Sequence, residues 1–411
     1  MKNKLLALLL LVGSQLATAQ DLLITNATLH TQGKNGVIEN TDVLIKSGRI
    51  ARIAPRIATN KMIRVINAEG HHVTPALFAG LTVSGLSEVE AVRESVDSSY
   101  SELHTDLMHP EFDVRVAYNP HSSVIPITRV EGFGYTLLTA TRGDRSLTGQ
   151  GGLVRFDGGY DSFEGGPVVY VQTSGRSANK VGGSRVAHWM LLQQAFAEAD
   201  GDQDADLLSV NGIEALNVAR EEGIFVFAAD RAADIMRVLA FIDEHKLEGV
   251  IHGGREAWMV AGALAEAEVP VILNALDNLP ADFDSLGARL DNAASLHEAG
   301  VTVIFSSGET HNARKVRQVA GNAAANGMPH SAALAAISTV PARVFGGEER
   351  DITKGSRADL VIWSGDPLEV TSIAEQVIMG GIPDSMISRQ TLLRDRYLPE
   401  NPTLPRAYIQ P

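Results

Sequence analysis

Short alternations of apolar and polar residues occur at both ends of the chain. Residues 22–29, 43–46 and 50–53 alternate in this way and are bounded by Gly and Asn, a pattern typical of antiparallel strands. A sheet of this size cannot bury a core alone, and residues 358–363 and 373–380 offer further strands. We therefore predict a small composite β-sandwich built from both chain ends, residues 20–73 and 348–394.

Longer apolar segments alternate with helical patterns in residues 74–347. Strands are predicted at 73–85, 135–140, 168–172, 224–228, 249–252, 269–274 and 301–306. Helices are predicted at 187–199, 211–222, 232–245, 256–267 and 312–325. This alternation favours a parallel sheet closed into a (β/α)₈ TIM barrel within an α/β fold.

Two Gly-rich stretches, residues 143–166 and 174–184, interrupt this pattern. They are too long for ordinary strand-to-helix loops, so we expect them to be functional or mobile, in a role that the sequence does not specify. Residues 395–411 contain four prolines and are predicted to form an extended tail.

Composition limits the partners. The chain has 411 residues, is 45% hydrophobic, and carries a net charge of −14, which argues against nucleic acid and anionic membrane surfaces as partners. It contains no cysteine, so disulfides, thiolate ligands and a thiol nucleophile are excluded.

The N-terminus has the pattern of a secretory signal peptide over residues 1–19. Lys2 and Lys4 precede a short apolar run, and residues 17–19 (Ala-Thr-Ala) form a cleavage site. No later run is apolar for long enough to span a bilayer. We predict a periplasmic or secreted protein without a transmembrane segment after signal removal.

Several separated motifs carry a family resemblance. Residues 73–85 (VTPALFAGLTVSG) match the frame V-x-P-G-L-[IVF]-D-x-H-x-H, and they follow Ser-Gly-Arg-Ile at 47–50. Further matches are Asp-Arg-Ala-Ala-Asp-Ile (230–235), Gly-Gly-Arg-Glu-Ala-Trp (253–258), His-Asn-Ala-Arg (311–314) and Lys-Gly-Ser-Arg-Ala-Asp-Leu-Val-Ile-Trp (354–363). In this order and spacing, the chain resembles the amidohydrolase superfamily, and within it the exported imidazolonepropionase-like branch.

The resemblance implies a barrel that holds one or two divalent metals at its C-terminal mouth and hydrolyses carbon–nitrogen bonds. It also implies which residues should bind the metal, and most of these positions are substituted. Leu81 and Val83 stand where the family has its first histidine pair, Ala228 where it has a further histidine, and Gly308 where it has the last-strand aspartate. His252 stands near the position of the family's sixth-strand histidine.

Two functional hypotheses follow. The first is a degenerate homologue, a pseudoenzyme without the usual metal site, that acts as a binding or partner subunit for an active amidohydrolase-family relative or a small amide ligand. The alternative is an active metal-dependent hydrolase of non-peptide or cyclic amide bonds. Its site would be rebuilt from His252, Glu309 and His311, a sufficient ligand set for zinc. A capping or loop-bracing role for His311 also stays open.

Overall fold

The computed structural model describes residues 21–100, 108–140, 146–202 and 206–398. The predicted signal peptide, residues 1–19, lies outside the described residues, as do residues 399–411 of the predicted tail. Among the described residues, no helix combines the length and the apolar character needed to cross a membrane.

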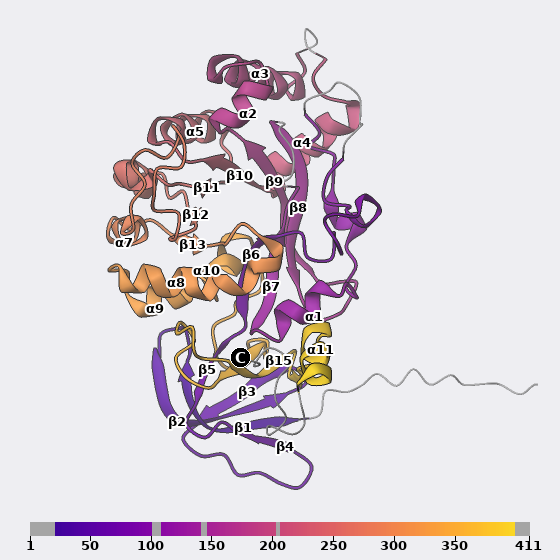
Figure 1. Ribbon diagram of the computed structural model, residues 1–411, viewed down its shortest axis with the longest axis vertical. Coiled ribbons are helices and arrows are strands. Elements are labelled where there is room, and N and C mark those ends of the chain that lie inside the picture. Colours follow the sequence, from indigo (N-terminus) through magenta and orange to yellow (C-terminus); the bar gives the residue numbers. More distant parts are fainter. Residues whose placement is uncertain (1–20, 101–107, 141–145, 203–205, 399–411) are drawn as a thin grey trace, which may run out of the picture.

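Both chain ends contribute to one mixed sheet, which we call the terminal sheet (Figure 1). Its N-terminal strands are β1 (Leu22–His30), β2 (Val37–Lys46), β3 (Arg49–Ala54), β4 (Arg64–Asn67) and β5 (His72–Pro75). Its C-terminal strands are β14 (Leu360–Trp363), β15 (Ala374–Met379) and β16 (Ile382–Pro383). The two groups join where β5 pairs antiparallel with β14. The ends meet as predicted, but they pair as a single sheet, and a two-layered sandwich stays a prediction.

The middle of the chain forms a second sheet, the barrel sheet, with its strands in sequence order. They are β6 (Leu77–Thr82), β7 (Phe133–Leu138), β8 (Leu147–Arg155), β9 (Phe163–Gln172), β10 (Ile224–Ala229), β11 (Gly249–Gly253), β12 (Val271–Leu273) and β13 (Val303–Phe305). The barrel is nearly closed. Between its first and last strands the Leu81 backbone N–H donates to Ser306 Oγ at 3.0 Å, in place of a strand ladder.

The prediction of eight regular β/α repeats is wrong at β8. This strand runs antiparallel to both β7 and β9, and it occupies much of the Gly-rich stretch predicted as a long loop. The glycines let the backbone of β8 pack closely against its neighbours, so this stretch forms a strand and not a loop. A Cβ on Gly151 would lie only 1.9 Å from the Leu138 carbonyl oxygen.

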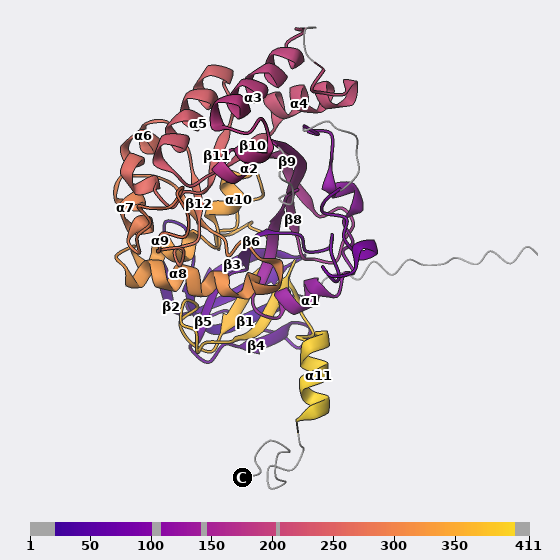
Figure 2. The ribbon, with the colours of Figure 1, turned by 45° about the horizontal axis from the view of Figure 1, so that its top comes forward.

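Helices surround most of the barrel sheet (Figure 2), whereas the helix Val340–Val344 packs against the apolar cluster inside it. The helices are α1 (Val124–Arg129), α2 (Gly175–Lys180), α3 (Arg185–Ala199), α4 (Val210–Glu222), α5 (Ala232–His245), α6 (Ala261–Glu266), α7 (Asn292–Glu298), α8 (Val316–Ala325), α9 (His330–Ala335) and α10 (Val340–Val344). Short 3₁₀ turns occur at Arg93–Ser95, Val114–Ala117, Ala257–Val260 and Thr310–Lys315. The second Gly-rich stretch contains α2. The last helix, α11 (Arg389–Tyr397), takes up residues 395–397, which were predicted to begin the extended tail.

Candidate functional site

A cavity of about 750 Å³ opens where strands β9 to β12 end, at the C-terminal mouth of the barrel. We call it the mouth cavity. Its walls come from α2, the start of α3, and the segments that follow β10, β11 and β12. The charged residues among its lining are Arg176, Arg185, Asp230, Arg255, Asp282 and Asp284. Barrel folds place their ligand sites at this end, because the strand ends bring residues from several segments together.

Asp230 follows β10 directly and places a partly buried carboxyl group in the mouth cavity. Burial raises its pKa from 3.8 to about 6, although the nearby Arg255 opposes this shift. The Arg255 backbone N–H donates to Asp230 Oδ1 at 3.3 Å, and the Arg255 Nε atom lies 3.9 Å from the same oxygen. Gly253 leaves room for the carboxyl group, since a Cβ there would lie 2.5 Å from Oδ1. In the sequence, Asp230 belongs only to a family motif, and no chemical role is predicted for it.

Arginine side chains fasten the segment between β12 and α7 over the mouth cavity. Arg255 lies 3.1 Å from Asp277 and 4.0 Å from Asp282. Arg185 bonds to Asp234 at 2.9 Å and also to Asp284, which accepts from the Gly175 N–H at 2.8 Å. Arg185 and Arg255 already have carboxylate partners, so they are less available to a polar ligand. Arg176 has no ionic partner among the described residues and is therefore the more available cation.

His252, on β11, is bonded to Tyr170 across the inside of the barrel. The distance from Tyr170 Oη to His252 Nδ1 is 2.5 Å. Burial, helped by the nearby Arg255, lowers the pKa of His252 to about 4, so its ring is neutral at pH 7. Burial also raises the pKa of Tyr170, which therefore stays protonated. The pair is a neutral hydrogen-bonded unit.

Glu309 and His311 lie apart from His252. They follow β13, and β12 stands between β13 and β11 in the sheet. The Glu309 carboxylate and the His311 ring are 3.6 Å apart, and both side chains are exposed. Together with Leu81 and Val83 they line a separate hollow of about 150 Å³. Within residues 21–100, 108–140, 146–202 and 206–398, no group of three or more His, Asp or Glu side chains is placed to hold a metal ion.

The four positions to which the family resemblance assigns metal ligands have apolar or absent side chains. Leu81 and Val83 are 4% and 5% exposed, and Ala228 packs against the apolar core inside the barrel. Gly308 has a positive φ of 71°, which suits a tight turn. None of these residues offers a side-chain nitrogen or oxygen.

A serine–histidine pair that the sequence did not indicate lies at the start of β8. Ser146 Oγ is hydrogen-bonded to His188 Nε2, and both residues are buried. Burial lowers the pKa of His188 to about 4. No carboxylate among the described residues contributes to this shift, so the pair lacks the acid that orients the histidine of a catalytic triad.

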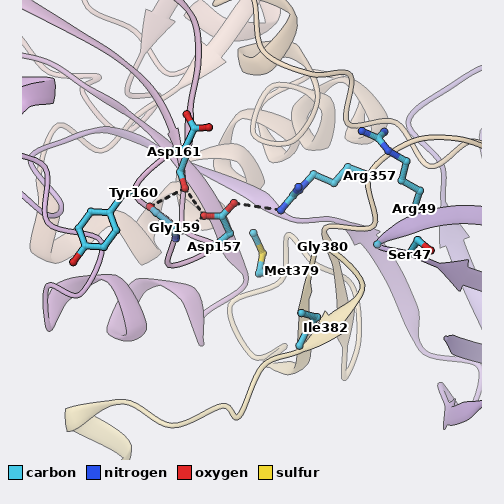
Figure 3. Close-up of a pocket in the computed structure, with 12 residues that line it drawn as sticks. Ser47, Arg49, Asp157, Gly159, Tyr160, Asp161, Arg357, Met379, Gly380 and Ile382 are labelled. Atoms are coloured by element: carbon cyan, nitrogen blue, oxygen red, sulfur yellow. Dashed lines mark hydrogen bonds and ion pairs between the residues drawn. The ribbon is translucent and has the colours of Figure 1, made fainter. Parts of the chain in front are cut away.

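A larger hollow, of about 820 Å³, lies away from the mouth, between the β8–β9 turn and the terminal sheet (Figure 3). Its central contact is the ion pair of Arg357 with Asp157, at 3.3 Å. Asp157 also pairs with Arg155 at 2.9 Å. We assign this hollow a structural role because its central charges are already neutralised by protein partners.

Comparison with known proteins supports the fold. No family model matches the chain. A segment of 89 residues, 21% of this chain, is 37% identical to the amidohydrolase tasK from Hapsidospora irregularis, of which it covers only 9%. An amidohydrolase from Thermotoga maritima MSB8 superposes with a TM-score of 0.78 at 19% identity, covering 88% of this chain and 99% of that one. The β-aspartyl dipeptidase from Fervidobacterium islandicum AW-1 has a TM-score of 0.52 at 16% identity, covering 89% and 96%.

These neighbours are members of the amidohydrolase superfamily, and this chain has their fold: a TIM-like α/β barrel with a second sheet. At such low identities the likeness concerns the fold alone. Activity must be argued from the site.

Proposed function

We propose that this chain is an exported protein of amidohydrolase fold that has lost the usual metal site and serves as a binding or partner subunit. The partner is an active amidohydrolase-family relative or a small amide ligand. The single observation that carries the proposal is the chemistry of the barrel mouth. Positions that the family resemblance assigns to metal binding are held by Leu81, Val83, Ala228 and Gly308.

The packing of these residues supports the proposal further. Leu81 belongs to the apolar cluster inside the barrel, and Val83 belongs to the adjoining one. A histidine at either place would have to bury a polar ring, which costs free energy unless a metal or another partner binds it. A catalytic zinc normally needs three protein ligands, and the residues present do not fit such a centre.

The mouth cavity supports a binding role. It has the size of a small-molecule site, and it combines the exposed guanidinium of Arg176 with the partly buried carboxyl group of Asp230. A ligand could therefore be held by charge and hydrogen bonds without a metal.

Metal analysis tests the proposal. The protein is purified from the exported fraction of cells grown with zinc and manganese, and its metal content and N-terminal residue are measured. We expect well below one metal ion per chain, no hydrolysis of amide or cyclic amide substrates, and Gln20 at the N-terminus. A stoichiometric metal that is lost in the His252→Ala variant would refute the proposal.

One observation favours the alternative hydrolase. Glu309 and His311 line the same hollow as Leu81 and Val83, so two donor groups lie next to the position of the family's first histidine pair. If they bind zinc, His311→Ala and Glu309→Gln should each abolish the bound metal, while His297→Ala, on α7, should not. Equal, low metal content in all of these variants would reject the rebuilt site.

A further inference from the structure

Three histidines and an aspartate meet where the terminal sheet adjoins the barrel. His30 ends β1, His72 begins β5, His330 begins α9, and Asp366 follows β14. We call this group the seam. In both views α8 and α9 lie on the side of the barrel that faces the terminal sheet (Figures 1 and 2). The seam therefore joins strands of the terminal sheet to a helix of the barrel.

The two strand histidines are bonded to each other. His30 Nε2 lies 2.7 Å from His72 Nδ1, and the rings stack with centroids 5.0 Å apart. One of the facing nitrogens must donate and the other must accept. The contact therefore exists while only one of the two facing nitrogens carries a proton, and it is lost when both do.

Burial and neighbouring charges make His30 difficult to protonate. His30 is 8% exposed, and burial is the main reason why its pKa falls to about 4. The positive charges that His72 and His330 can carry act in the same direction, and Asp366 opposes them. Asp366 is itself engaged by His330 at 2.8 Å. The adjacent His71 faces outward to Glu375, at 2.7 Å.

The segment that carries Asp366 is tied firmly to the barrel. Arg317, on α8, donates to the carbonyl oxygens of Pro367, Glu369 and Ser372 at 2.7 to 2.9 Å. The β14–β15 connection of the terminal sheet is thus held to α8 by bonds that do not titrate near neutral pH. The histidine pair is the part of the seam that can change with pH.

We propose that the seam is acid-sensitive: protonation of His30 beside His72 loosens the pairing of β1 with β5 while the barrel stays folded. The free histidine accepts a proton near pH 6.5, and the buried His30 accepts it only near pH 4. Folded chains therefore bind fewer protons than unfolded ones between these values. The stability of the seam is complete above about pH 6.5 and is lost as the pH falls toward 4.

Hydrogen exchange of the unmodified full chain tests the seam directly. Amide protection is compared at pH 7.5 and pH 5.0, after correction for the intrinsic exchange rate, at the seam residues 28–30 and 72–74. We expect exchange at the seam to accelerate at least about tenfold relative to α5, the internal control. Unchanged protection at the seam, or an equal loss in α5, would overturn the proposal.

Matched variants identify the responsible pair. His30→Gln and His72→Asn place amides near the bonded ring nitrogens, so the double variant can keep a hydrogen bond without titrating. From pH 7.5 to pH 5.0 the melting temperature of the double variant should fall by at least about 3 °C less than that of the wild type. His71→Asn should behave like the wild type.

A full wild-type loss in the double variant would contradict the proposal. A second outcome would also contradict it: stoichiometric Zn²⁺ slows hydrogen exchange at the seam in the wild type but not in the double variant. The histidine pair would then be a metal site. If the double variant does not fold, the hydrogen-exchange experiment on the unmodified chain still tests the proposal.

Discussion

Asp230 shows at the scale of one residue how burial sets the chemistry of the mouth cavity. Its side chain is 24% exposed, and the guanidinium of Arg255 is 3.9 Å away. This distance is too long for a hydrogen bond, so the arginine compensates only partly for lost hydration. With a pKa of about 6 the carboxyl group can exchange a proton near neutral pH.

Replacing Asp230 with Asn should stabilise the protein above pH 6. The folded-state pKa lies above the ordinary value, so the folded protein binds the extra proton between pH 4 and 6. The carboxylate therefore lowers stability at high pH, and this penalty fades as the pH falls.

We expect Asp230→Asn to raise the free energy of unfolding by about 2 kcal/mol at pH 7.5 and by much less at pH 4.5. Urea denaturation at both values measures this. Asp277→Asn, which removes another carboxylate near Arg255, should give no such gain. A destabilised Asp230→Asn protein at pH 7.5 would show that Arg255 depends on this carboxylate.

At the scale of elements, the antiparallel strand β8 depends on its glycines. It pairs on one side with β7 and on the other with β9, so its backbone has close neighbours on both edges. Gly149 has a positive φ of 134°, and a Cβ there would lie 2.4 Å from the Phe112 carbonyl oxygen. These positions admit no side chain without movement of the backbone.

Gly151→Ala should therefore destabilise the protein by at least about 2 kcal/mol, because the added Cβ would overlap the Leu138 carbonyl. Gly262→Ala is the matched control. Gly262 lies in α6 with no atom within 4 Å of the added Cβ, so the same change should stabilise by about 0.5–1 kcal/mol. Urea midpoints of the two variants should move in opposite directions, and a neutral Gly151→Ala would refute the packing argument.

At the scale of the whole molecule, a ring of alternating charges joins the barrel to the terminal sheet. Successive contacts of 2.6 to 3.3 Å link its six side chains. In order around the ring they are Arg350, Asp359, Arg357, Asp157, Arg155 and Glu164. Half of these residues come from strands β8 and β9 and the turn between them, and half from the segment that leads into β14. Arg350 also lies over the buried ring of Tyr135, at 3.9 Å from its centroid.

Arg350→Met should cost about 3 kcal/mol, because it leaves the buried carboxylates of Glu164 and Asp359 without their shared cation. Arg394→Met, in the exposed α11, should change stability by less than about 0.5 kcal/mol. Thermal unfolding of both variants tests the difference. A small effect of Arg350→Met would mean that the ring adds little to the joining of the two sheets.

Periodicity alone predicted much of the fold. The helix predicted at 232–245 has those bounds in α5, and the strand predicted at 249–252 is β11 within one residue. Local pattern succeeds there because each element buries one face. It failed at β8, where Gly-rich sequence indicated a loop, since strand direction and edge contacts depend on residues distant in the sequence.

The sequence by itself determined that Leu81, Val83, Ala228 and Gly308 offer no side-chain nitrogen or oxygen to a metal in any fold. It also determined that strands at the two chain ends would need one another, because neither group can bury a core alone. Only the tertiary structure decided that His252 bonds to Tyr170 and lies apart from Glu309 and His311. It alone raised the pKa of Asp230 and paired His30 with His72. Distances between segments and loss of hydration both arise from long-range packing, which local sequence does not encode.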